Sequence, residues 1–97
     1  MRLHHTERLT ESVARLTAEF LGRRRDRNLV TVSGARLDRA HHSAIIFLTV
    51  YPESAAGQTL VEVKKWRREL RDFLDERLRG SSLTHVNFAL DESPALI

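Results

Sequence analysis

A long amphipathic stretch, residues 58–80, most constrains how this 97-residue chain can fold. Its apolar residues recur mainly at intervals of three and four, which places them on one face of an α-helix. A helix over this range would be about 30 Å long at ~1.5 Å per residue. The apolar face comprises Leu60, Val63, Trp66, Leu70, Phe73, Leu74 and Leu78. Such a face needs cover, so we expect the helix to pack on a core.

Both ends of this helix carry sequence signals. Thr59 and Glu62 have the spacing of a capping box, in which each side chain accepts a hydrogen bond from a free backbone N–H group of the first turn. Gly80 is the residue type that ends a helix in the left-handed conformation. We therefore expect the helix to begin at Thr59 and to end near Gly80.

Arg67 does not fit this pattern. On a straight helix it falls inside the apolar arc, and a guanidinium is rarely buried without a partner. Three interpretations remain open. The aliphatic stem passes over apolar neighbours to bring the charge to solvent, the helix bends between Trp66 and Arg68, or Arg67 serves a ligand.

The N-terminal part of the chain predicts a second amphipathic helix. Thr6 is its expected N-cap, and the chain leaves the helix near Gly22. The apolar residues between them recur at intervals of four, three and four, as Leu9, Val13, Leu16 and Phe20.

Three strands are predicted between and after the helices. The first starts at residues 29–32 and continues to Leu37, with a bulge at Ser33 and Gly34, because the apolar residues change parity there. Residues 38–41 form a turn, and residues 43–50 form an antiparallel second strand that is apolar on both faces and hence interior. Residues 85–90 alternate as a half-exposed third strand.

The predicted order is helix, strand, strand, helix, strand. Two long apolar helix faces need a common surface, so both helices should cover one face of a three-stranded sheet. This is an α+β fold. We expect a single domain over residues 1–97, with residues 1–5 and 92–97 flexible.

Positive charge is clustered in two runs. Of the sixteen Lys and Arg residues, four lie within residues 23–27 and five within residues 64–71. Guanidinium groups pair bidentately with phosphate, so clustered arginine favours a nucleic-acid partner. Each run by itself also fits a solvated loop or helix face.

The sequence has no catalytic or metal-binding pattern. None of the five histidines has the i, i+4 spacing of a zinc pair, and there is no nucleophile elbow or glycine-rich phosphate loop. We therefore expect a protein that is not an enzyme and has no metal, cofactor or small-molecule substrate. The absence of cysteine, of a signal core and of a long apolar run leads us to expect a soluble, cytoplasmic chain that does not bind membranes.

Several segments resemble the bacterial ribosome-binding factor A family over nearly the whole chain. The matching segments of the first hairpin are residues 30–33, Leu37 with Asp38, and residues 44–49. On the long helix they are Leu70 with Arg71, and at the end of the third strand the F-x-x-D-x-S segment within residues 87–93.

The resemblance implies a type II KH-like fold. In that family a small-x-Gly kink in the long helix replaces the G-x-x-G loop with which ordinary KH domains clamp nucleotides. The matching positions here are Trp66, Arg67 and Arg68, without a small residue or glycine. A kinked and a continuous helix therefore both remain open.

The resemblance also implies a function. Members bind the immature 30S ribosomal subunit at 16S rRNA and assist late maturation and processing of the rRNA 5′ end, without enzymatic activity. Together with the charge runs, this makes Arg23, Arg24, Arg25, Arg27, Lys64, Arg67, Arg68 and Arg71 the expected RNA-binding residues of a monomer. The alternative is a KH-like protein-interaction module that has lost RNA binding. It is favoured by the missing small-x-Gly sequence and by the near absence of the family's C-terminal extension.

Overall fold

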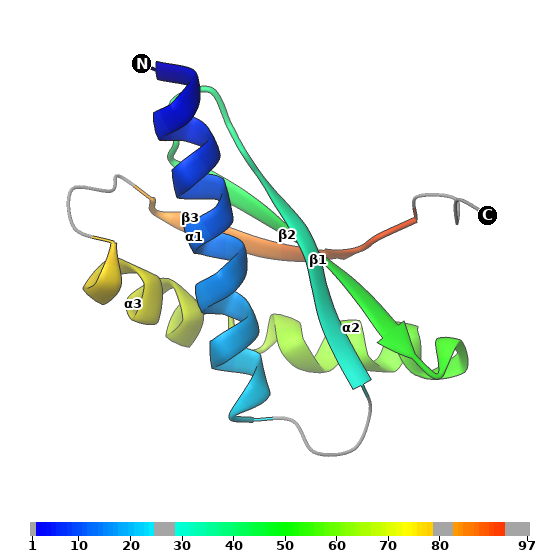
Figure 1. Cartoon of the computed structure of the whole chain (residues 1–97). Coiled ribbons are helices and arrows are strands. Elements are labelled where there is room, and N and C mark those ends of the chain that lie inside the picture. The colour runs from blue at the N-terminus through cyan, green and yellow to red at the C-terminus, as the bar shows by residue number, and fades with distance from the viewer. Residues whose placement is uncertain (1, 25–28, 79–82, 93–97) are drawn as a thin grey trace.

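The computed structural model describes residues 2–24, 29–78 and 83–92 (Figure 1). Its elements follow the predicted order, with the second helix divided in two. They are α1 (Arg2–Gly22), β1 (Leu29–Leu37), β2 (Ser43–Tyr51), the 3-10 helix η1 (Glu53–Ala55), α2 (Ala56–Lys64), α3 (Arg67–Arg77) and β3 (His85–Leu90).

The sheet has the order β1-β2-β3, with β1 antiparallel and β3 parallel to the central β2. The predicted interior position of β2 is confirmed. On its helix-covered face Ile46 and Leu48 are fully buried, whereas Ile45 on the other face is 42% exposed. The second face of this apolar strand is therefore covered only in part.

The predicted bulge in β1 is also confirmed. Val32 pairs with Leu48 and Gly34 with Phe47, so Ser33 is the extra residue. The insertion resets the alternation of the strand. Consequently Val30 and Val32 before it, and Ala35 and Leu37 after it, pack against the same core.

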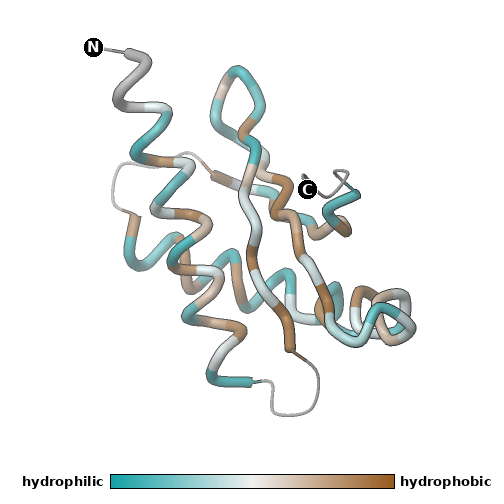
Figure 2. The backbone as a smooth tube through the Cα atoms, turned by 45° about the vertical axis from the view of Figure 1, so that its right-hand side comes forward, coloured by the Kyte–Doolittle hydropathy of each residue, from teal (hydrophilic) through white to brown (hydrophobic). Residues whose placement is uncertain are grey.

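All three helices cover one face of this sheet. Val13 and Phe20 of α1 belong to a single buried cluster with Leu70 of α3 and with Ile46 and Phe88 of the sheet. Figure 2 shows hydrophobic residues recurring along α1 and along the strands. The fold is thus a two-layer α+β arrangement, as predicted.

The two predicted helix caps are wrong. Helix α1 begins at Arg2, so Thr6 is inside it, and the Thr6 hydroxyl lies 3.4 Å from Nε2 of His41 in the turn between β1 and β2. Helix α2 begins at Ala56, because the 3-10 turn closed by the N–H of Ala55 on the Pro52 carbonyl starts helical geometry upstream. Thr59 is consequently inside α2, where it is only 2% exposed. Gly80, the predicted terminator, lies outside the described residues.

The long helix is interrupted at Lys65 and Trp66. Their N–H groups bond to the carbonyls of Glu62 and Val63, three residues back, at 3.2 and 2.9 Å. These tighter turns end the α-helical ladder of α2, and α3 starts at Arg67. Arg67 is exposed, and its Nε donates to the Lys64 carbonyl at 3.0 Å. The predicted bend of the helix is therefore confirmed, and a ligand-binding role of Arg67 stays a prediction.

Gly34 is not required by the bulge. A Cβ built at this position meets nothing within 4 Å, and its φ lies outside the left-handed region. Gly34→Ala should leave the free energy of unfolding unchanged or raise it by about 0.4–1 kcal/mol, because alanine restricts the unfolded chain. Urea denaturation measures this. Ile46→Ala, expected to lose about 2–5 kcal/mol, calibrates the assay. A clear loss with Gly34→Ala would show that the bulge depends on glycine.

The turn between β1 and β2 is held by Asp38. Its Oδ1 accepts the N–H of His42 at 2.7 Å and that of Ser43 at 3.0 Å. Both bonds lower the pKa of the Asp38 carboxyl below its usual value, and the bond from Ser43 has the larger effect. The charged form of Asp38 therefore stabilises the hairpin.

Protonation of Asp38 should weaken the fold in acid. Because the folded pKa is below the unfolded one, the stabilisation is complete above the unfolded pKa of about 3.9 and is lost as pH falls through the folded pKa. We expect wild type and Asp38→Ala to differ in free energy of unfolding at pH 7 and to converge toward pH 3. Asp75→Asn, an exposed carboxylate on α3, is the control and should keep the wild-type pH profile. A constant difference between wild type and Asp38→Ala at every pH would contradict this role.

Candidate nucleic-acid interface

The break between α2 and α3 opens onto a cleft of about 680 Å³ at the start of β3. The helices and the break supply one wall, and the chain entering β3 supplies the other. The cleft is lined by Lys64, Lys65, Arg67, Arg68, Glu69, Arg71, Thr84, His85 and Val86.

The cleft is strongly cationic. Five of its lining side chains are Lys or Arg, against the one carboxylate of Glu69. Lys65 and Arg68 are exposed, and within the described residues neither has an ion pair or side-chain hydrogen bond. Among the described residues, the one ion pair of Arg71 is a long contact of 3.4 Å with Asp72. These guanidinium and ammonium groups can therefore bind phosphate at little cost in existing interactions.

The start of α3 adds to this potential. The helix begins at the cleft, and its N-cap, Trp66, provides no side-chain hydrogen bond. The N-terminal end of a helix carries partial positive charge and free N–H groups, which favour anions. The backbone and the basic side chains thus act in the same direction.

The structure brings together one of the two predicted runs of basic residues. Lys64, Arg67, Arg68 and Arg71 all line the cleft, because the break places the end of α2 and the start of α3 on one wall.

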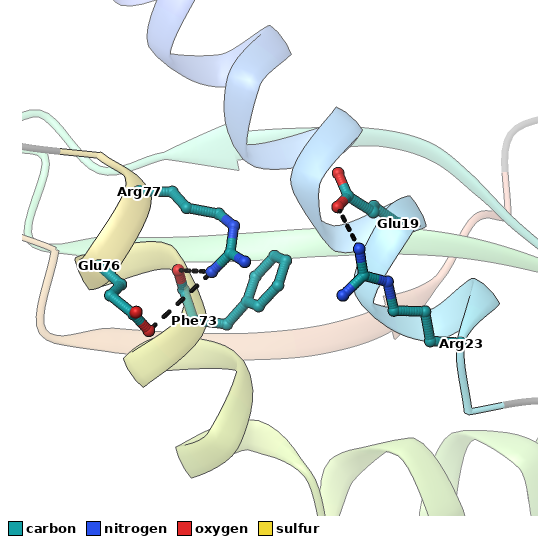
Figure 3. A network of polar contacts seen from close by, with 5 residues as sticks. All are labelled: Glu19, Arg23, Phe73, Glu76 and Arg77. Carbon is teal, nitrogen blue, oxygen red and sulfur yellow. Dashed lines mark hydrogen bonds and ion pairs between the residues drawn. The ribbon is translucent and has the colours of Figure 1, made fainter.

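The other run is not part of the lining. Arg23, directly after the end of α1, pairs with Glu19 of that helix at 3.0 Å (Figure 3). Arg24 pairs with Glu69. Arg25 and Arg27 lie outside the described residues.

Arg24 connects α1 to the helix break. Its Nη2 lies 2.7 Å from Oε2 of Glu69, and its guanidinium lies over the rings of Phe20 at 4.5 Å and Trp66 at 5.7 Å. The Phe20 ring in turn packs against Phe73 of α3 at 5.3 Å. The Arg24 contacts therefore hold the first turn of α3 against α1 and neutralise the one acidic side chain of the cleft.

Figure 3 shows a second arginine whose guanidinium lies over an aromatic ring, further along α3. The Arg77 guanidinium lies 3.8 Å from the centre of the Phe73 ring, and its Nη1 donates to the Phe73 carbonyl at 3.5 Å. Arg77 is thereby directed along its own helix and is not part of the cleft lining.

Five lining residues were not predicted as site residues from the sequence, namely Lys65, Glu69, Thr84, His85 and Val86. Lys65 belongs to the same basic run, so its charge was a usable signal. Thr84 and His85 had none, because only the register of β3 brings them to the cleft. Their N–H groups bond to the His42 carbonyl at 2.8 and 3.1 Å, which fixes the start of β3 beside β2.

The described part of the chain was also searched for metal-binding clusters and for membrane-spanning helices. No group of three or more His, Asp or Glu side chains within it is placed to hold a metal ion. None of the helices in the same residues is long and apolar enough to cross a membrane.

Comparison with known proteins identifies the fold. No protein-family model matches the chain, and no curated protein matches it in sequence. Among solved structures, the crystal structure of ribosome-binding factor A from Thermus thermophilus matches with a TM-score of 0.78 and 23% identity. The match covers 92% of this chain and 99% of that one. The chain therefore has the ribosome-binding factor A fold, a type II KH-like arrangement.

The Arg24 contacts predict a measurable effect on stability. Arg24→Ala should lower the free energy of unfolding by about 1–2 kcal/mol, from a partly exposed ion pair and two contacts with aromatic rings. Trp66 is the only tryptophan, so its fluorescence should also change in the folded variant. Arg23→Ala removes an exposed i, i+4 pair at the end of α1 and should cost no more than about 0.5 kcal/mol. Equal losses in the two variants would mean that the Arg24 contacts contribute nothing beyond surface charge.

Proposed function

We propose that this chain is a non-enzymatic assembly factor that binds the 30S ribosomal subunit through 16S rRNA. The observation that carries the proposal is the basic cleft at the helix break. Five Lys and Arg side chains converge there with the uncapped start of α3. The fold supports it as well, because the solved structure with the same fold is a ribosome-binding factor.

The position of the cleft fits recognition of an RNA backbone. KH domains clamp the sugar–phosphate chain at the connection between two helices, where this chain has its break. Trp66 does not offer a stacking platform, since it is partly buried against the core and has Arg24 over its ring. Recognition would rest on phosphate positions and RNA shape.

The basic residues would have different roles in RNA binding. Lys65, Arg68 and Arg71 would make the principal phosphate contacts, because they are exposed and weakly engaged. Lys64 and Arg67 would contact the RNA where it passes the helix break. Arg23, Arg25 and Arg27 would add long-range attraction, while Arg24 would position the start of α3.

The biological role proposed is assistance in late maturation of the subunit, including processing of the rRNA 5′ end, by a cytoplasmic monomer. Such a role needs binding and no bond-breaking chemistry by the chain itself.

Co-sedimentation with purified 30S subunits, 50S subunits and 70S ribosomes over a salt series tests the proposal. We expect selective pelleting with 30S. Arg68→Ala with Arg71→Ala should lower the slope of log affinity against log salt by about 1.4–1.8, for two phosphates lost. Arg8→Ala with Arg15→Ala removes two exposed arginines from α1 and is the matched control, with a slope close to wild type.

Other outcomes would each reject part of the proposal. Equal binding to all particles would indicate a general basic surface. No binding at low salt would favour the protein-interaction module. Identical slopes for the two double variants would reject the cleft as the binding site.

A further inference from the structure

The face of the sheet that the helices leave uncovered carries exposed apolar side chains. In the described part of the chain, the exposed large apolar residues are Leu29, Ile45, Tyr51 and Val61. The first three lie on strands, and Val61 lies on α2. Ile45 and Tyr51 alternate along β2 with buried side chains, and Leu29 pairs in register with Tyr51. Exposed apolar side chains that lie together on one face mark an interaction surface. We call this surface the open face.

The open face combines aromatic rings with hydroxyl groups. β2 contributes the rings of Phe47 and Tyr51, and Thr31 of β1 pairs in register with Thr49 between them. The Arg36 guanidinium lies 5.9 Å from the centre of the Phe47 ring. The residues of the three strands include no Asp or Glu. Aromatic rings on a sheet that lacks carboxylates are suited to stacking with the bases of single-stranded nucleic acid.

The open face is continuous with the basic cleft. His85 lines the cleft and is the first residue of β3. Along β3 the side chains of His85 and Asn87 are exposed, and the residues that follow each of them are buried. Both exposed side chains therefore lie on the open face, where Asn87 pairs in register with Ile45. An RNA strand held in the cleft reaches the open face by passing His85.

We propose that the open face is a stacking surface for unpaired bases of the RNA whose backbone the basic cleft holds. The inference rests on the proposed function and extends it from the sugar–phosphate chain to the bases. Tyr51 is 71% exposed and Phe47 is half-buried, so Tyr51 is the main stacking residue. Because every base has a π-face, stacking adds affinity for single-stranded RNA without selecting its sequence.

The neighbouring charges favour RNA over a protein as the occupant. The cleft attracts phosphate to the start of β3, and it repels a basic protein segment that approaches the same end of the sheet. An acidic segment has only Arg36 to pair with on the strands themselves. Asp91 and Glu92 border a hollow beside Phe47, so the RNA backbone is expected on the side of the cleft and not at that margin.

The test measures the binding of a fluorescent oligoadenylate of about ten nucleotides over a salt series. Tyr51→Ala should weaken binding about five- to a hundredfold at every salt concentration. The slope of log affinity against log salt should stay at the wild-type value, because stacking neutralises no phosphate. Arg68→Ala with Arg71→Ala should change that slope. Val61→Ala truncates a similarly exposed apolar side chain on α2 and should bind as wild type does.

An abasic oligonucleotide of the same length and charge isolates the contribution of the bases. It has no ring to stack on Tyr51, so wild type and Tyr51→Ala should bind it equally. Circular dichroism and the fluorescence of Trp66 check that the variant is folded, as the exposure of Tyr51 leads us to expect.

Several results would overturn the inference. Wild type fails to bind oligoadenylate at low salt, Tyr51→Ala binds it as Val61→Ala does, Tyr51→Ala changes the salt slope, or Tyr51→Ala also weakens the binding of abasic RNA. The proposed function survives each of these results if the Arg68 and Arg71 double variant still loses affinity for 30S subunits, so the two proposals can fail separately.

Two further measurements identify a different occupant. If Tyr51→Ala weakens binding to 30S subunits but not to protein-free 16S rRNA, a ribosomal protein occupies the open face in place of RNA. If sedimentation velocity shows a dimer that Tyr51→Ala dissociates, a second copy of the chain occupies it.

Discussion

A guanidinium in the middle of an apolar helix face is costly to bury without a partner, and the break between α2 and α3 avoids that cost. On a continuous helix, Arg67 would point into the core between Leu74 and Leu78. The break exposes Arg67 and keeps Trp66, Leu70 and Leu74 packed against the core. The cleft, the uncapped start of α3 and the gathering of basic side chains all depend on this interruption.

The break needs support, because it contains neither glycine nor proline to enforce it. Arg24 supplies that support from α1 through Glu69 and the Trp66 ring. A residue that sequence reasoning assigned to RNA contact therefore also sets the geometry of the site. Arg24 of the first basic run pairs with Glu69, which lies within the second run, and neutralises its carboxylate.

Much of the fold could be predicted because it depends on local patterns. The parity change at Ser33 predicted the bulge, and the double-sided apolar run of β2 predicted a central strand. The caps could not be predicted in the same way. Thr6 and Thr59 have the composition of N-caps, but the helices begin upstream of them, and Thr59 is buried in the core. A capping pattern specifies which bonds a terminus can make, and it does not exclude an earlier terminus made by backbone bonds.

The sequence by itself determined the class of fold, the core faces of the helices and the charge of the surface, since all of these follow from the spacing of apolar and basic residues. Only the tertiary structure decided that the long helix breaks, that Lys65 joins the cleft, and that Thr84 and His85 form its opposite wall. It also decided that Arg24 is engaged with Glu69, forty-five positions away. Contacts of this kind depend on how α1 and β3 pack against the rest, which no local pattern encodes.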